Sequence, residues 1–294
     1  MHSRATDGRG ASKCEGKWPD QTLEQAFGLP EVQVTVSTSR LSCKRAGKTR
    51  TLMPVWDSSG ESVKMPDIVF LFDVDNTLID NDRVQAHLKE HLEQAYGVVA
   101  RDRYWVILEQ LRSELGYVDY LAALERYRLE DLHRPELLRM SSWLVDYPFG
   151  DRLYPDALSA VRHVQQWGIA VILSDGDAVF QPRKVERSGL WQAFNNRVLI
   201  YVHKEQRLDD VERLYPADHY VLIDDKLRIL DAVKKIWCER VTTVFPKQGH
   251  YAFDPAILAE YPPADIELPR IGALIDCDLS AFLRNRVASH TGRK

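Results

Sequence analysis

The sequence predicts an α/β fold, in which a doubly wound, Rossmann-like parallel sheet carries an inserted all-helical cap domain. Three observations lead to this prediction. Strongly apolar runs alternate with amphipathic segments after residue 67, one block at residues 83–148 breaks the alternation, and polar clusters follow four of the apolar runs. Alternating strands and helices imply right-handed crossovers, which place helices on both faces of a parallel sheet.

Five apolar runs predict the strands. The run at residues 68–72 is apolar throughout, as expected of a strand buried on both faces. Similar runs follow at residues 169–173, 198–202, 220–223 and 241–245. Between them, helical patterns lie at residues 155–167, 182–188 and 226–237, and the first two are followed by capping glycines, Gly168 and Gly189.

The block at residues 83–148 is predicted to be a helical cap. Helical patterns lie near residues 84–96, 103–115, 118–127 and 136–145, with no strand pattern among them. Asp80, Asn81 and Asp82 are expected to cap the first of these helices. Because open α/β sheets bind ligands at the carboxyl ends of their strands, we expect the block to cover that edge.

The remaining boundaries follow from composition. The α/β core is predicted at residues 65–82 and 149–275. Residues 1–64 are rich in Ser, Thr, Gly and basic residues and are interpreted as a mobile or accessory extension, with one strand pattern at residues 32–36. Residues 276–294 are interpreted as a polar tail.

Composition excludes several classes of protein. Of the 294 residues, 45% are hydrophobic and 28% charged, which is typical of globular proteins. The net charge of −4 argues against general electrostatic binding to nucleic acid. No apolar run approaches the roughly 20 residues that span a membrane. The four widely spaced cysteines favour a reducing, cytoplasmic compartment, and nothing in the sequence indicates an oligomeric state.

Polar residues follow four of the predicted strands. Parallel strands end at one edge of a sheet, so these residues should meet in one crevice. In chain order they are Asp73 and Asp75; Ser174, Asp175 and Gly176; Lys204; and Asp224 and Asp225.

This combination of side chains indicates chemistry on a phosphate. Converging carboxylates repel one another unless a cation lies among them, and hard oxygen ligands suit Mg²⁺. A carboxylate can attack phosphorus and form an aspartyl-phosphate. A lysine and a serine hydroxyl suit phosphoryl oxygens, and a glycine lets backbone amides approach them.

The same residues resemble a known family. Residues 70–78, FLFDVDNTL, are similar to the first motif of the haloacid dehalogenase-like hydrolases in its phosphatase form, DxDxT. Ser174 resembles the second motif, Lys204 the third, and Asp224 with Asp225 the acidic fourth. The resemblance covers about residues 65–274, and the helical block lies where such proteins carry a C1-type cap.

The resemblance implies a Mg²⁺-dependent phosphatase that acts on a small phosphorylated metabolite. Asp73 would be the nucleophile, and Asp75 would protonate the leaving oxygen and then activate water. The implied Mg²⁺ ligands are Asp73, the main-chain oxygen of Asp75, Asp224 and, directly or through a ligand, Asp225. The implied phosphate-binding residues are Ser174, Asp175, Gly176 and Lys204. Many relatives have Asn at the position of Asp175, a departure that bears on substrate choice.

Three alternatives remain open at this point. A phosphomutase or phosphotransferase differs mainly in the group that receives the phosphoryl. A 2-haloacid dehalogenase uses the same aspartate to attack carbon, but it needs neither a metal nor an acid at the position of Asp75. A catalytically silent binding module would lack a nucleophile, a lysine or a metal ligand, and this sequence retains all three.

Overall fold

The computed structural model describes residues 68–130, 132 and 137–277. All of them belong to the second of two compact units of the chain, Val55–Lys294. The predicted N-terminal extension with its strand pattern, and the predicted tail after Cys277, lie outside the described residues.

The core is a parallel sheet of six strands in the order β3-β2-β1-β4-β5-β6. In the central pairings, Phe72 of β1 lies opposite Ile172 of β2 and Ile223 of β4. This sheet confirms the predicted doubly wound α/β fold. The strands are β1 (Ile68–Phe72), β2 (Ile169–Asp175), β3 (Val198–Tyr201), β4 (His219–Ile223), β5 (Val241–Pro246) and β6 (Ile266–Leu268).

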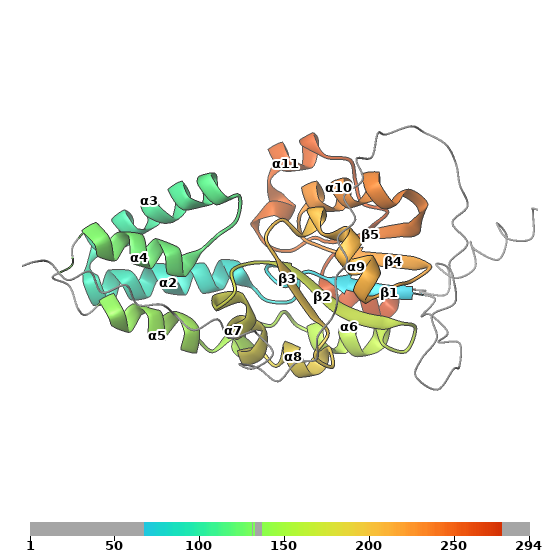
Figure 1. The fold of residues 1–294 in the computed structure, drawn as a ribbon, viewed down its shortest axis with the longest axis horizontal. Coiled ribbons are helices and arrows are strands. Elements are labelled where there is room, and N and C mark those ends of the chain that lie inside the picture. Colours follow the sequence, from blue (N-terminus) through green and yellow to red (C-terminus); the bar gives the residue numbers. More distant parts are fainter. Residues whose placement is uncertain (1–67, 131, 133–136, 278–294) are drawn as a thin grey trace, which may run out of the picture. The chain divides into compact units, whose positions relative to one another are not determined.

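Helices cover both faces of the sheet (Figure 1). One face packs against α6 (Ala157–Val164), α7 (Phe180–Arg187) and α8 (Leu190–Ala193), and the other against α9 (Leu208–Leu214) and α10 (Leu227–Trp237). Strand β1 shows why its sequence is apolar at every position. Phe70 and Phe72 point into the first hydrophobic cluster, whereas Val69 and Leu71 point into the second.

Four helices inserted between β1 and β2 form the cap, which extends from the carboxyl edge of the sheet (Figure 1). Amphipathic packing gives the cap its own buried residues, among them Leu88, Tyr104 and Ile107. The buried Tyr104 hydroxyl donates to the carbonyl of Tyr120 at 2.8 Å and so joins two cap helices. The helices are α2 (Asn81–Tyr96), α3 (Val98–Leu115), α4 (Tyr120–Glu130) and α5 (Leu138–Asp146).

The structure also contains short elements that the sequence patterns did not predict. These are β6, α8, α9 and α11 (Pro255–Glu260), of which none exceeds seven residues. The helix expected at residues 155–167 is shorter, because α6 ends at Val164. Gly168 is required here for close approach, since a Cβ atom would lie 2.4 Å from the carbonyl oxygen of Ile68.

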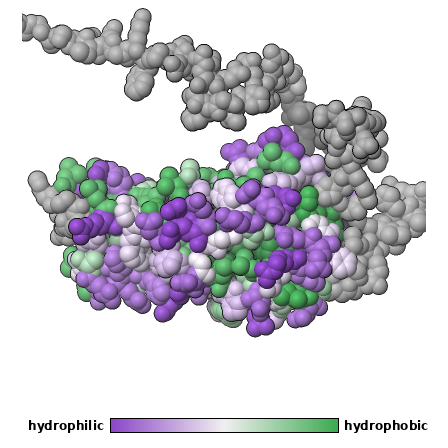
Figure 2. Space-filling view, turned by 90° about the horizontal axis from the view of Figure 1, so that it is seen from below, coloured by the Kyte–Doolittle hydropathy of each residue, from purple (hydrophilic) through white to green (hydrophobic). Residues whose placement is uncertain are grey.

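The described surface is largely polar. Figure 2 shows hydrophilic residues spread over the face seen there, with hydrophobic residues scattered among them. Among the described residues, no helix has the length and apolar character needed to cross a membrane.

Candidate active site

The carboxyl end of β1 holds Asp73 at the centre of the sheet. Its backbone N–H donates to the carbonyl of Ile223 at 2.9 Å, so the β1–β4 pairing continues past the end of the strand. The residue is 2% exposed. Two neighbouring strands therefore fix the position of this carboxylate before any ligand is present.

Three buried carboxylates meet beside this strand end. Asp73, Asp224 and Asp225 each offer an oxygen, and these oxygens lie within 4.8 Å of one another. We call these residues the carboxylate trio. In the part of the chain that the structure describes, Asp73 Oδ2 and both carboxylate oxygens of Asp225 lack a hydrogen-bond partner. Unpaired buried carboxylate oxygens are costly, so this geometry calls for a cation.

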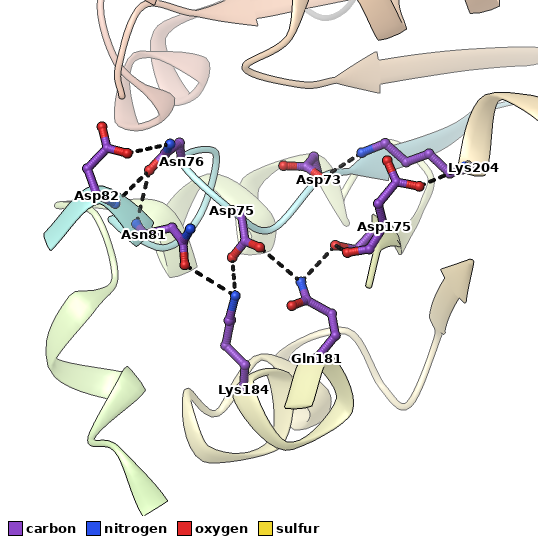
Figure 3. Close-up of polar contacts among 10 residues, drawn as sticks. Asp73, Asp75, Asn76, Asn81, Asp82, Asp175, Gln181, Lys184 and Lys204 are labelled. Carbon is purple, nitrogen blue, oxygen red and sulfur yellow. Dashed lines mark hydrogen bonds and ion pairs between the residues drawn. The ribbon is translucent and has the colours of Figure 1, made fainter. Parts of the chain in front are cut away.

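Lys204 supplies part of the positive charge. Its Nζ atom lies 2.5 Å from Asp73 Oδ1 (Figure 3). The same atom lies 2.6 Å from Asp224 Oδ2, and all three side chains are at least 97% buried. Burial opposes the charge of this lysine, but Asp224 and Asp73 outweigh burial and raise the pKa of Lys204 well above its usual range. Lys204 therefore orients Asp73 and leaves Asp225 without a direct partner.

The trio fits a hard divalent cation. Its donors are all carboxylate oxygens, the ligand type that Mg²⁺ prefers. Burial raises the pKa of Asp225 well above its ordinary value. The charge of Lys226 opposes this shift, and the nearby charges of Asp73 and Asp224 add to it. Burial likewise raises the pKa of Asp224 to about 6, against the opposing influence of Lys204. Further positive charge beside Asp224 and Asp225 would therefore favour their ionised forms.

This electrostatic imbalance predicts a pH-dependent stability for the metal-free protein. Folding favours protonated Asp224, because the folded pKa of about 6 lies above the ordinary value of 3.8. This contribution to the free energy of unfolding is fully present below pH 3.8 and is lost as the pH rises through about 6. Asp225 is the trio member without a direct partner, and burial disfavours its charge in the same way. In EDTA at about pH 7.5, Asp225→Asn should therefore raise the Tm, and it should reduce the Tm increase that added Mg²⁺ produces.

Calorimetric Tm values between about pH 5 and pH 8, with EDTA or Mg²⁺, measure this effect. The exposed Asp209 on α9 provides the matched control, because Asp209→Asn changes the same charge away from the trio. If Asp225→Asn left the Mg²⁺-induced Tm shift at its wild-type size, the trio would not be the cation site.

The Asp75 side chain points away from Asp73, toward Gln181 and Lys184 of α7 (Figure 3). Its Oδ1 atom accepts from Lys184 Nζ at 2.6 Å, and Gln181 Nε2 lies 3.5 Å from its Oδ2. Lys184 is completely buried and also donates to Asn81 Oδ1 at 3.3 Å. The Asp75 side chain remains 26% exposed, so its carboxyl group is held in place and still reaches the cavity described below.

The sequence analysis missed Lys184 and Gln181. The two residues lie three apart on α7, which places them on one face of the helix. No local sequence pattern marks the two residues, because this face of α7 meets Ser174 and Asp75 only in the folded structure. Gln181 Nε2 donates to Ser174 Oγ at 2.9 Å, which links the second motif to Asp75.

Asp175 and Gly176, predicted to bind phosphate, lie at the end of β2 and contact backbone groups. The Asp175 carboxylate accepts the backbone N–H of Lys204 at 2.7 Å, and the Gly176 N–H donates to the carbonyl of Tyr201 at 3.0 Å. At Gly176 a Cβ atom would lie 2.5 Å from Gln181 Cβ. These contacts use Asp175 and Gly176 to hold the Lys204 loop, and their role in binding phosphate stays a prediction.

A short loop joins the catalytic strand to the cap. Asn76 adopts a left-handed backbone with φ of 59°, and its Oδ1 atom accepts the N–H groups of Asn81 and Asp82 at 3.0 and 3.1 Å. Asp80 caps α2 as predicted, by accepting the N–H of Arg83. Asp82 instead reaches the core, where it accepts the backbone N–H of His250 at 2.8 Å.

Cap and core enclose a cavity of about 290 Å³ beside Asp75. Asp75, Asp175 and Asp225 line it, whereas Asp73, Ser174 and Lys204 are buried and do not. The cap contributes Gln85, Arg112, Gly116, Tyr117, Val118 and Tyr120; the core lining includes Lys226, Arg228, Tyr251, Glu260 and Tyr261. This volume is at the small end of ligand pockets, which indicates a small molecule rather than a protein.

The comparisons with known proteins agree with this architecture. Residues 69–235 match the family described as haloacid dehalogenase-like hydrolase. A haloacid dehalogenase-like hydrolase from Burkholderia xenovorans LB400 shares 59% sequence identity, with a TM-score of 0.71, over 74% of this chain and 98% of that chain. The chain belongs to the haloacid dehalogenase-like hydrolase family. Membership makes it a hydrolase and leaves the choice between a phosphate ester and a haloacid to the chemistry of the site.

Two further solved structures are similar. A family hydrolase from Xanthomonas campestris shares 17% identity, with a TM-score of 0.54, over 82% of this chain and 98% of that one. An L-2-haloacid dehalogenase from Xanthobacter autotrophicus shares 20% identity, with a TM-score of 0.46, over 72% and 98%. The first shows a common fold alone, and the second similarity is too weak to carry an argument. No curated protein matches the sequence.

Proposed function

We propose that this hydrolase is a Mg²⁺-dependent phosphatase of a small phosphorylated metabolite, working through an aspartyl-phosphate on Asp73. The observation that carries the proposal is the carboxylate trio with its unpartnered oxygens. Attack on a phosphate ester brings further negative charge to Asp73, which a bound cation offsets. Attack on a haloacid carbon has no need of a buried cation site.

Asp73, Asp75, Lys204 and Ser174 have separate roles in the two steps of the proposed reaction. A carboxylate oxygen of Asp73 attacks phosphorus, and the bond from phosphorus to the leaving oxygen breaks as Asp75 protonates that oxygen. Water then attacks the same phosphorus, Asp75 takes its proton, and the bond to Asp73 breaks to release inorganic phosphate. Lys204 orients Asp73. The Ser174 hydroxyl accepts from Gln181 and donates to the carbonyl of Asp175 at 3.3 Å, a long bond that it would exchange for one to a phosphoryl oxygen.

Mg²⁺ bound by Asp73, Asp224, Asp225 and the main-chain oxygen of Asp75 would neutralise phosphoryl charge during both steps. The position of Asp75 also supports the phosphatase. A leaving alkoxide needs an acid near it, whereas a leaving halide does not. The free thiols of Cys238 and Cys277 are compatible with the cytoplasmic location that forms part of this proposal.

The deciding experiment measures two products in parallel. Phosphate release from 4-nitrophenyl phosphate and small alkyl phosphates is followed with Mg²⁺ or EDTA, and chloride release is followed from L-2-chloropropionate. We expect Mg²⁺-dependent phosphate release and no chloride. Chloride release without Mg²⁺ would instead identify a dehalogenase, and transfer of the phosphoryl group without phosphate release would identify a mutase.

Isotope placement tests the bond that water breaks. Reaction in H₂¹⁸O should place ¹⁸O in the released phosphate and leave the peptide that contains Asp73 unlabelled, because water attacks phosphorus. In the dehalogenase reaction water attacks the carbonyl carbon of the Asp73 ester, so the label would enter that carboxylate. Mass spectrometry of the peptide after limited turnover distinguishes the two reactions, and a labelled peptide would contradict the proposal.

A further inference from the structure

A second group of polar side chains lines the cavity, distinct from the carboxylate trio and Asp75. It consists of Arg112 from cap helix α3, Lys226 from the loop after β4, and Tyr251 from the short 3₁₀ helix His250–Phe253, and we call it the Tyr251 cluster. The Arg112 guanidinium donates to the Tyr251 hydroxyl oxygen. Arg112 Cζ lies 6.0 Å and Lys226 Nζ 5.7 Å from the centroid of the Tyr251 ring. Two cations from different domains therefore stand beside one phenol.

Arg112 and Tyr251 can each make a further hydrogen bond to a ligand. The Arg112 guanidinium has its nearest carboxylate, Glu109, at 3.6 Å on the exposed side of its own helix. Within the described residues, Lys226 Nζ has no carboxylate oxygen within 4.0 Å and lies over the Tyr251 ring. At longer range the charges of Asp225, Asp73 and Asp224 attract it, and they raise the pKa of Lys226 against its burial. The Tyr251 hydroxyl accepts from Arg112 and keeps a proton that it can donate.

The other cations around the cavity already have partners. Lys184 pairs with Asp75 at 2.6 Å, Arg228 with Glu205 at 2.9 Å, and His250 with Asp82 at 2.7 Å. Glu260 also lines the cavity, is exposed and hydrogen-bonds with Tyr261. The described cap residues that line the cavity include no acid. Among the described cations that line the cavity, Arg112 and Lys226 are therefore the two without a direct carboxylate partner inside it.

We propose that the substrate carries a second anionic group besides its phosphoryl group, and that Arg112, Lys226 and Tyr251 bind this second anion. A carboxylate or phosphate beside the Tyr251 hydroxyl accepts from the phenol and the guanidinium and lies in the field of both cations. This inference rests on the proposed phosphatase function and adds the class of substrate, a small phosphomonoester with a second acidic group. Because Arg112 belongs to the cap and Lys226 to the core, the second anion contacts both domains.

A matched pair of aryl phosphates tests the inference. The pair is 4-(carboxymethyl)phenyl phosphate and its neutral isostere 4-(carbamoylmethyl)phenyl phosphate, in which a methylene group insulates the leaving phenol from the changed substituent. We expect wild-type kcat/KM to favour the carboxylate about tenfold or more, as a charge-assisted contact provides. 4-(Phosphonomethyl)phenyl phosphate shows whether the cluster prefers a carboxylate or a phosphate-like second anion.

Two variants assign the preference to the cluster. Arg112→Gln retains an N–H donor for Tyr251 but removes the charge, and it should bring the carboxylate and the amide to within about twofold. Arg103→Gln removes an arginine of the same helix that pairs with Glu130 and does not line the cavity, and it should keep the full preference. Equal kcat/KM for the two esters in the wild type, or an unchanged preference in Arg112→Gln, would overturn the inference.

A binding measurement separates this inference from the proposed function. 4-(Carboxymethyl)benzylphosphonate and its carbamoylmethyl counterpart have no ester to hydrolyse, and calorimetry gives their Kd for the wild type and Arg112→Gln. A carboxylate preference lost in Arg112→Gln, without hydrolysis of any ester, would retain the second-anion site and reject the phosphatase. Hydrolysis of both esters with equal binding of the two phosphonates would retain the phosphatase and reject the second-anion site. Failure of both phosphonates to bind would reject the site as well.

Discussion

Asp73→Asn should lower phosphate release at least about 10³-fold, the scale seen when a covalent nucleophile is removed. The amide that replaces the carboxylate is a poor nucleophile, so no aspartyl-phosphate forms. The fold should persist, because Asp224 still pairs with Lys204 at 2.6 Å and the backbone of residue 73 still bonds to Ile223. Initial rates with saturating Mg²⁺, together with the Tm of each protein, measure the effect.

Asp177→Asn is the matched control for this prediction. Asp177 Oδ1 accepts the backbone N–H groups of Val179 and Phe180 at 2.8 and 2.6 Å, where an asparagine oxygen serves equally well. The residue does not line the cavity, so the variant should retain near-wild-type activity. Activity of Asp73→Asn within tenfold of the wild type would show that another group attacks the substrate.

The fold was predictable because the sheet is buried on both faces. A strand such as β1, with Phe70 on one side and Leu71 on the other, must be apolar at every position, and this gives an unambiguous signal. The trio was predictable for a related reason, since adjacent parallel strands β1 and β4 deliver Asp73 and Asp224 to the same edge. The missed elements, β6 and three helices of seven residues or fewer, are too short for periodicity to show.

The partner of Asp75 was not predictable for a different reason. Lys184 is completely buried, but in the sequence it lies in a segment, QPRKVER, whose charges suggest an exposed helix. Its contact with Asp75 spans 109 residues and exists only because α7 packs beside the β1 loop. The same holds for Arg112 and Tyr251, which meet across 139 residues. Long-range pairs of ordinary charged residues leave no local pattern in the sequence.

The ion pair of Lys184 and Asp75 should make the two residues unequal in their effect on stability. Asp75→Asn leaves a fully buried ammonium with the neutral Asn81 amide 3.3 Å away, and it should cost about 3 kcal/mol of unfolding free energy. This cost is at the lower end of the range for breaking a buried ion pair, because the Asp75 side chain is 26% exposed. Lys184→Met removes the buried charge and keeps the volume, so it should cost far less.

A double-mutant cycle tests this asymmetry. If the cost of Asp75→Asn comes from the stranded ammonium, most of it should disappear in the Lys184→Met background, as measured by urea unfolding of all four proteins. The exposed pair of Arg183 on α7 and Asp146 at the end of α5, 3.3 Å apart, is the control and should show little coupling. An equal cost of Asp75→Asn in both backgrounds would mean that Lys184 does not hold Asp75. Another contact would then have to hold Asp75 in its position.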